Sequence, residues 1–220
     1  MPSLDQGDQH LVQVLRAHTG QLYAAALLAV LGAVLLAAFF VVLTRLVPEG
    51  SPGWGLLRVS LAGCLITQTM VAVGTSFGLA GLHAAAGNAG AGLVALCVRG
   101  LWLTYLASGV PTIVFTATGV LGLRQAGLSP PWVSAVGWLS AAAHLLVLFT
   151  FAQRGAFALD GIIAGLVPLT TVIWILALAA TLPRSRRAAV AATTSSDTVE
   201  TALPSRAAIA VTDSRHAGPA

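Results

Sequence analysis

Three side chains that could do chemistry interrupt long apolar runs of this sequence: Arg99, His144 and Gln68. A guanidinium can bind an anion, an imidazole can relay a proton or hold a metal, and an amide can hydrogen-bond to a solute. Ionisable residues within apolar segments are candidates for function by default, because they are costly to bury. We therefore take these three residues as the candidate polar sites of the chain.

His144 is the only histidine well inside an apolar run, so it is the candidate ligand for a haem or a metal. Ligation of haem by two histidines needs both imidazoles at one depth on facing helices. The nearest partner, His83, ends another apolar run and is expected several residues shallower. The sequence therefore favours a His144 that hydrogen-bonds to a neighbouring helix, and it predicts neither a cofactor nor a metal.

Residues for acid–base or nucleophilic catalysis are scarce. The only acidic residues outside the two tails of the chain are Glu49, in a turn, and Asp160, which is placed to cap a helix or to pair with Arg154. Cys64 and Cys97 have neither metal nor redox spacing, and no GxSxG, HExxH or P-loop motif occurs. Enzymes that work inside membranes need such groups to converge on one pocket, so we expect no enzymatic activity.

The composition indicates the environment in which these residues lie. Hydrophobic residues make up 57% of the 220 residues and charged residues 8%, whereas about a quarter of the residues of a soluble domain are charged. The mean hydropathy of +0.88 points the same way. The basic residues are all arginine, and their only cluster, at 184–187, directly follows an apolar run. The sequence therefore predicts a bacterial membrane protein that binds no nucleic acid.

The apolar runs predict helices that cross the bilayer, because a helix needs about 20 apolar residues to do so. Residues 1–20 form a short interfacial segment, and residues 184–220 are small, polar and low in complexity, as is typical of a disordered cytoplasmic tail. The first run is too long for a cleaved signal peptide, and the residues before it carry too few basic side chains. We expect an all-α transmembrane bundle over 21–183 with about five spans, at 22–43, 59–82, 101–123, 132–152 and 161–182.

The arginines predict the orientation of the chain. With five spans, Arg45, Arg58, Arg124 and the 184–187 cluster fall on one face, and fewer arginines fall on the other. The positive-inside rule then places the N-terminus outside and the C-terminus in the cytoplasm of the bacterial cytoplasmic membrane. Six spans would leave Arg45 and Arg58 outside, so five are preferred.

Arg99 has two possible positions. If the third span begins at Leu101, the guanidinium reaches the outer interface, and the cost of burying a charge favours this position. If the helix begins near Gly90 instead, the cation lies about 13 Å along it. That second arrangement needs a partner for the cation, chosen from Gln68, Ser76, a carbonyl freed by Pro111 or an anionic ligand.

Small residues predict how the helices pack. Lipid tails are as apolar as leucine, so helices in a bilayer associate through close backbone contact and interhelical hydrogen bonds. Gly74 and Gly78 form a GxxxG pair in the second span, and Gly161 and Gly165 form another in the fifth. We expect both pairs to be helix-packing faces.

The run GVLGLRQAGLSPPWVSAVGWLSAAAHLL, at 119–146, carries a resemblance. A span ends in Gly and Leu, a short loop reads Gly-Leu-x-Pro-x-Trp, and the next span opens with glycine and alanine. With the phrase VIWILAL in the fifth span, this pattern resembles a family of uncharacterised small multi-pass integral membrane proteins of bacteria, over 50–182. The resemblance implies a helical bundle in a membrane and no assigned activity; it is carried by Gly127, Leu128, Pro130, Trp132 and Gly137.

Three functions follow from these observations. The first is a non-enzymatic accessory or assembly protein that contacts the lipid bilayer and other membrane proteins or a second copy of itself. The alternative is a small transporter or permease component with Arg99 near an anionic solute, because Pro111 and Pro168 each interrupt a span. The third is a membrane haem protein or lipid enzyme built on His144.

Overall fold

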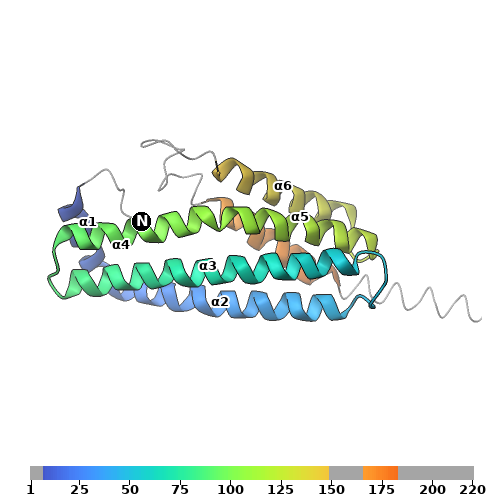
Figure 1. Cartoon of the computed structure of the whole chain (residues 1–220), viewed down its shortest axis with the longest axis horizontal. Coiled ribbons are helices and arrows are strands. Elements are labelled where there is room, and N and C mark those ends of the chain that lie inside the picture. The colour runs from blue at the N-terminus through green and yellow to red at the C-terminus, as the bar shows by residue number, and fades with distance from the viewer. Residues whose placement is uncertain (1–6, 149–165, 183–220) are drawn as a thin grey trace, which may run out of the picture.

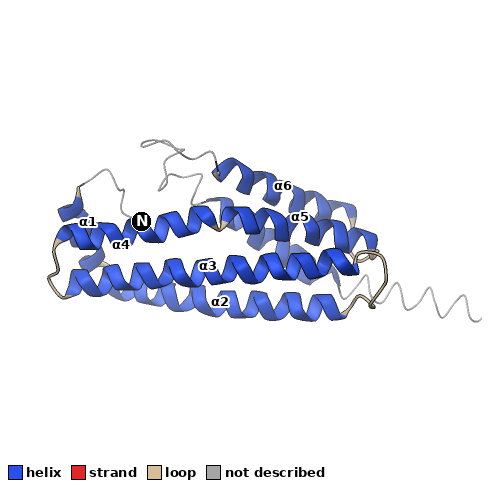
Figure 2. Ribbon diagram, in the orientation of Figure 1, coloured by secondary structure: helices blue, strands red, loops and turns tan. Residues whose placement is uncertain are grey.

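The structure is a computed structural model that describes residues 7–148 and 166–182, and the only regular elements in these two ranges are helices (Figures 1 and 2). The all-α prediction is confirmed. In chain order the helices are α1 (Asp8–Ala17), α2 (Thr19–Arg45), α3 (Trp54–Ala86), α4 (Ala91–Ala107), α5 (Gly109–Gln125), α6 (Pro131–Val147) and an unlabelled helix, Leu166–Leu182.

Three of these segments are long and apolar enough to cross a membrane: Thr19–Arg45, Trp54–Ala86 and the combined α4–α5 segment Ala91–Gln125. Their directions alternate, and they lie side by side along the long axis of the molecule (Figure 1). α3 is central, because it packs against α2, α4 and α5, whereas α6 packs on α5.

The helix that contains the third predicted span begins about ten residues before that span. We expected it at 101–123, whereas the helix begins at Ala91. The glycine-rich stretch before it supplies only a short turn, in which Asn88 adopts a φ of 57°, and Gly92 already belongs to the helix. Glycine favours turns only on average, and burial of Val94 and Ala95 overrides that preference.

A short break separates α4 from α5, between Ala107 and Gly109. Pro111 accounts for it, because proline has no N–H to bond to the carbonyl of Ala107 and its ring presses on that carbonyl. Hydrogen bonds resume on both sides, from Ser108 N to Thr104 O at 3.0 Å and from Thr112 N to Ser108 O at 3.1 Å. The two helices therefore continue in nearly the same direction.

The main core cluster lies toward the end of the molecule where α2 ends and α3 begins. Phe40 and Phe115 meet edge to face with ring centroids 5.3 Å apart, and Phe115 lies 5.9 Å from the ring of Trp174. Glycines allow this approach, since a Cβ on Gly63 would lie 2.9 Å from Cβ of Phe115 and a Cβ on Gly137 would overlap Val120. Close backbone contact around three aromatic rings thus joins α2, α3, α5, α6 and the Leu166–Leu182 helix.

A second, smaller cluster lies at the opposite end. Leu11 and Leu15 of α1 are buried against Val94, Ala95 and Val98 of α4. In the segment predicted to be interfacial, α1 is a separate helix that ends at a break around His18 and packs back on α3 and α4.

Two of the predicted spans are described only in part. α6 and the Leu166–Leu182 helix have 17 residues each, about 25 Å of helix. They run antiparallel, since Ser140 meets Thr171 and a Cβ on Gly137 would touch Trp174. Gly161, Gly165, Asp160, Arg154 and the predicted tail at 184–220 lie outside the described residues.

Candidate functional site

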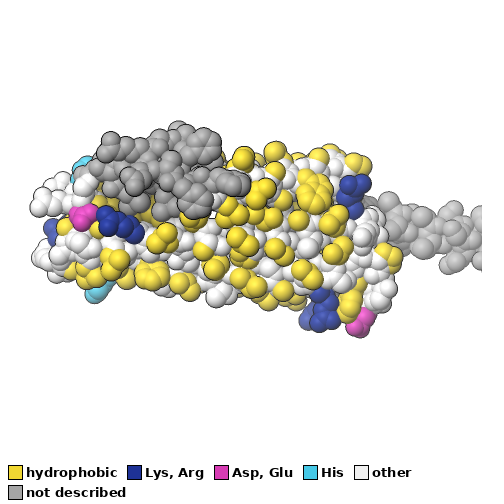
Figure 3. Space-filling model, turned by 45° about the horizontal axis from the view of Figure 1, so that its top comes forward, with side chains coloured by type: hydrophobic (Ala, Val, Ile, Leu, Met, Phe, Trp, Pro, Cys, Tyr) yellow, Lys and Arg dark blue, Asp and Glu magenta, His cyan; other side chains and the backbone are white. Residues whose placement is uncertain are grey.

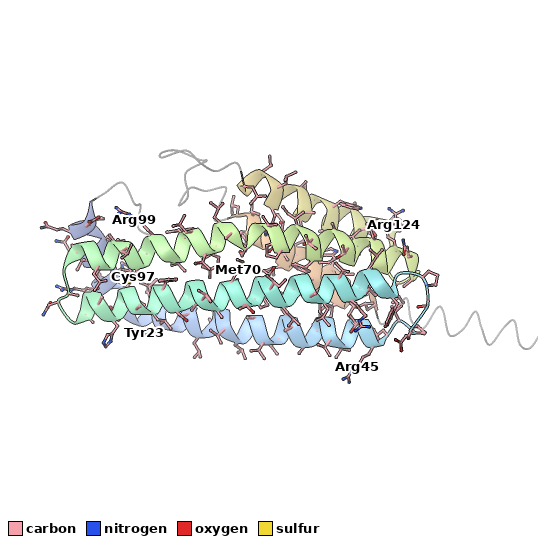
Figure 4. The ribbon with its side chains drawn as sticks, viewed as in Figure 1. Tyr23, Arg45, Met70, Cys97, Arg99 and Arg124 are labelled. Atoms are coloured by element: carbon pink, nitrogen blue, oxygen red, sulfur yellow. The ribbon has the colours of Figure 1, made fainter. Side chains whose placement is uncertain are left out.

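Arg99 lies near one end of the long α4–α5 segment, with its side chain 56% exposed (Figure 4). The 35 residues of that segment make about 52 Å of helix, about 22 Å more than the hydrocarbon core of a bilayer. A centred helix would therefore extend about 11 Å beyond the core at each end, and Arg99 is about 12 Å from the start of α4. The helix begins early, as the second of our two alternatives required, and yet the cation remains at its accessible end.

The partner of Arg99 is one that we did not anticipate. Its Nη2 lies 3.6 Å from Oδ1 of Asp8, the second described residue of the chain. Neither Gln68 nor Ser76 bonds to it. Sequence reasoning missed the pair because the two residues are far apart along the chain and meet only when α1 folds back on α4.

A second arginine holds α1 in place. Arg16 donates from Nε to the backbone oxygen of Ala85 and from Nη2 to Oδ1 of Asn88, each at 2.7 Å. Both acceptors are uncharged, so the positive charge of Arg16 is not neutralised by either of them. The guanidinium thus fastens α1 to the turn between α3 and α4.

His144 is buried, with an exposed fraction of 8%, in the last turns of α6. Its Nδ1 lies 2.9 Å from the backbone oxygen of Ser140, so through this atom it bonds to its own helix and not, as expected, to a neighbouring one. Ser140 makes the interhelical contact instead, because its Oγ lies 2.8 Å from Oγ1 of Thr171. Where two helices are in close contact, the small hydroxyl of Ser140 fits between them more easily than the larger imidazole of His144.

Buried hydroxyls join α3 to α5 in the same way. Ser60 donates to the backbone oxygen of Phe115 at 2.7 Å, and the hydroxyls of Thr67 and Thr112 lie 3.3 Å apart. Throughout 7–148 and 166–182, no buried side-chain nitrogen or oxygen lacks a hydrogen-bond partner. Gln68, on the same helix, is only half-buried. These polar groups therefore serve helix packing, and their bonds are already made within the chain.

The first predicted glycine pair packs α3 against α4. A Cβ on Gly74 would lie 3.4 Å from Cβ of Thr104, and one on Gly78 would lie 3.4 Å from Cδ2 of Leu101. Both glycines face α4 within the chain, and Gly78 also borders the open space between α2 and α4. The spacing indicates close packing, but it does not tell which helix covers the face.

Metal ligands do not gather in the described part of the chain: no group of three or more His, Cys, Asp or Glu side chains occurs there. Cys64 and Cys97 are both free thiols. They belong to different regions, since Cys64 is in the aromatic core cluster and Cys97 faces Gly81 near the α1 end.

A groove lies near the α1 end of the described chain. α2 and α4 both pack on α3 but hardly touch each other, which leaves a cavity of about 190 Å³ between them. Leu15 of α1 closes its outer end. The walls are almost wholly apolar; they include Leu22, Ala25, Ala26 and Ala29 of α2, Gly78, Leu79 and Leu82 of α3, and Val98, Leu101, Trp102 and Tyr105 of α4.

Small side chains explain why the groove exists. Where α2 faces the aromatic core it carries Phe40 and Leu43, both fully buried, but about two to three turns into the helix it carries Ala25, Ala26 and Ala29. An alanine cannot reach across the gap to α4, so the space stays open. The one threonine of the lining, Thr75, donates its hydroxyl to the backbone oxygen of Val71 at 2.8 Å and leaves the groove apolar.

Comparisons of the chain with protein-family models, with curated proteins and with solved structures find no match.

Proposed function

We propose that the chain is a multi-pass integral protein of the bacterial cytoplasmic membrane that acts as a non-enzymatic accessory or assembly partner. In this proposal it has five spans, with the N-terminus outside and the C-terminus in the cytoplasm. The partner is another membrane protein or a second copy of the chain.

The observation that carries the membrane location is the outward face of α2. Of the most apolar 18-residue window of this helix, only 11% is buried. Leu27, Leu28 and Leu35 are 70%, 66% and 62% exposed. Each such side chain loses about 1.5–3 kcal/mol if it faces water instead of an apolar medium. Figure 3 shows hydrophobic side chains over the middle of the molecule and charged ones at its two ends, as a bilayer requires.

The distribution of charge supports the orientation. Arg45 and Arg124 lie at one end of the bundle and Arg99 at the other (Figure 4). Arg58, stacked 4.7 Å from the ring centroid of Trp54, also belongs to the first end. Arg45, Arg58 and Arg124 at the first end outnumber Arg16 and Arg99 at the other, and this excess favours the cytoplasmic side.

The alternating helix directions support five spans. Val47, Leu123 and Leu182 share one core cluster, so α2, α5 and the Leu166–Leu182 helix all end at the same level. A bundle that begins at the α1 end and finishes at this level crosses an odd number of times.

The saturated hydrogen bonds favour an accessory role over transport. A transport site would be expected at the break between α4 and α5. There, however, Ser108 donates its hydroxyl to the backbone oxygen of Tyr105, and Thr112 donates to the backbone oxygen of Ser108, both at 2.7 Å. Polar groups that are already hydrogen-bonded within the chain have few bonds left for a solute. The broad apolar face of α2, in contrast, is a large surface against which a partner helix could pack.

Reporter fusions test the topology. We expect a fusion in the turn at Gly50 or at Gly127 to report the cytoplasm and one at Asn88 to report the outside. Alkaline phosphatase and green fluorescent protein serve as reciprocal reporters, since each is active on only one side. If Gly50 and Asn88 report the same side, or if alkaline carbonate removes the protein from membranes, the proposal is wrong.

Photo-cross-linking tests the accessory role. A photoreactive amino acid in place of Leu28 or Leu35, both on the exposed face of α2, should yield adducts with a second copy or with another membrane protein in living cells. A matched probe at the buried Leu43 should yield only contacts within the chain. Adducts with lipid alone from every exposed position would contradict the accessory role.

A further inference from the structure

The groove ends where α1 brings a cation to the surface. Leu15 closes this end, and the next residue, Arg16, bonds to the backbone oxygen of Ala85 at 2.7 Å. Ala85 follows Leu82, a lining residue, by less than one helical turn. The guanidinium therefore lies about 5 Å along the bundle axis from the outer end of the groove.

We propose that the groove between α2 and α4 holds one acyl chain of a phospholipid, drawn from the leaflet on the α1 side, and that Arg16 binds the phosphate of that lipid. This inference rests on the proposed membrane location, which makes lipid the medium around the groove.

The dimensions of the groove select a hydrocarbon chain. On α4 its lining runs from Val98 to Tyr105, about 10 Å of helix. A helix with its side chains is about 10–12 Å wide, too wide for a cavity of about 190 Å³. Apolar cavities of comparable size exclude water and accept hydrocarbon. A flexible chain of methylene groups fits both the width and the chemistry.

The depth of the groove selects one leaflet. Half of a hydrocarbon core is about 15 Å thick. The groove begins beneath Leu15 and reaches about 10 Å inward, so it stays within the leaflet on the α1 side. A chain that enters sideways between α2 and α4 would place its headgroup at the level of α1.

The charge of Arg16 selects a phosphate. A guanidinium has five N–H donors and matches phosphate oxygens well. Ala85 and Asn88 engage it from one side and contribute no negative charge. Arg99, by contrast, already has Asp8 as a counter-ion. The exposed cation beside the groove is therefore complementary to an anionic headgroup.

The test uses the full chain in vesicles of phosphatidylglycerol and phosphatidylethanolamine that contain a trace of phospholipid with a photoreactive acyl chain. After illumination, adducts are mapped by mass spectrometry. We expect Leu79 and Trp102, in the groove, to be labelled more heavily than Leu35, on the exposed face of α2.

Two alanine variants of α2 make this comparison specific. Ala29→Phe places a ring in the groove and should lower labelling of Leu79 and Trp102 to the level of Leu35. Ala38→Phe, on an exposed part of the same helix, should change nothing. Equal labelling of groove and exposed positions in the unaltered chain, no effect of Ala29→Phe, or adducts with a protein segment in the groove would overturn the proposal. Absence of labelling everywhere, Leu35 included, would instead refute the membrane location.

Arg16→Gln tests the headgroup. When the photoreactive chain is carried on phosphatidylglycerol or on phosphatidylethanolamine, the preference of the groove for the anionic lipid should fall about tenfold in this variant, the effect of losing one charge-assisted hydrogen bond. Arg45→Gln, at the opposite end, is the control and should leave the preference unchanged. If the unaltered chain shows no preference, or if Arg16→Gln retains it, Arg16 does not bind the phosphate.

Discussion

The helices pack differently in the two halves of the bundle. In the half around Phe40, Phe115 and Trp174, which we call the closed half, glycines bring the backbones together and aromatic rings fill the centre. In the half around the groove, which we call the open half, alanines line α2 and a cavity remains. Hydrocarbon surrounds both halves in our proposal. A membrane helix therefore gains little from apolar character alone, and contact depends on matching shapes.

The largest effect should come from emptying the closed half. Trp174→Ala removes a fully buried ring that contacts both phenylalanines and leaves a cavity. We expect the variant to lose about 3–5 kcal/mol of unfolding free energy, measured by denaturation in mixed micelles. Trp132→Ala, whose ring is 55% exposed at the start of α6, serves as control and should have a much smaller effect.

The next largest effect should come from overfilling the closed half. A Cβ on Gly137 would overlap Val120 and the ring of Trp174, so Gly137→Val should destabilise by about 1–3 kcal/mol. Gly32→Val is the matched control, because nothing lies within 4 Å of a Cβ at Gly32. Similar losses in the melting temperature for the two variants would mean that the closed half is not tightly packed.

The open half should respond with the opposite sign. Ala26→Leu adds volume to the groove and should raise the unfolding free energy by about 1 kcal/mol in detergent, as cavity-filling substitutions commonly do. The measurement is the shift in melting temperature relative to Ala38→Leu on the exposed face. A destabilised Ala26→Leu would show that α2 and α4 already meet, and the distinction between the halves would fail.

The smallest effect should come from the ion pair that ties α1 to α4. Asp8→Asn removes the partner of Arg99, but both side chains are about half exposed and 3.6 Å apart. Exposed pairs contribute less than about 1 kcal/mol, so unfolding should change little and the change should vanish at high salt. A larger loss would show that the docking of α1 depends on this contact, and hence that the open half is held mainly by charge.

Part of this architecture is readable from the sequence, and the limits have physical causes. Apolar runs and arginine positions predicted α2, α3 and the ends of the bundle, because these features are local. The start of α4 near Gly90 was the less favoured of our two alternatives, and burial of Val94 explains why it holds despite the nearby glycines. The partner of Arg99 was missed because a contact between distant segments leaves no local pattern.

The groove could not be predicted from the sequence either. Alanines at 25, 26 and 29 are ordinary in an apolar helix, and their consequence appears only when α2 and α4 are held apart by α3. The GxxxG spacing of Gly74 and Gly78 did indicate close packing, but a spacing does not identify the partner helix.

α3 and the α4–α5 segment are both longer than a bilayer is thick. A bilayer is about 40–45 Å thick with its headgroups, whereas the 33 residues of α3 make a rod of about 50 Å. Upright in the proposed membrane, α3 would therefore be about 5–10 Å longer than the bilayer is thick, so the turn at Asn88, with α1 bound beside it, would lie at the level of the headgroups. That turn at one end, and the turns at Gly50 and Gly127 at the other, are the parts of the described chain that a protein confined to water could touch.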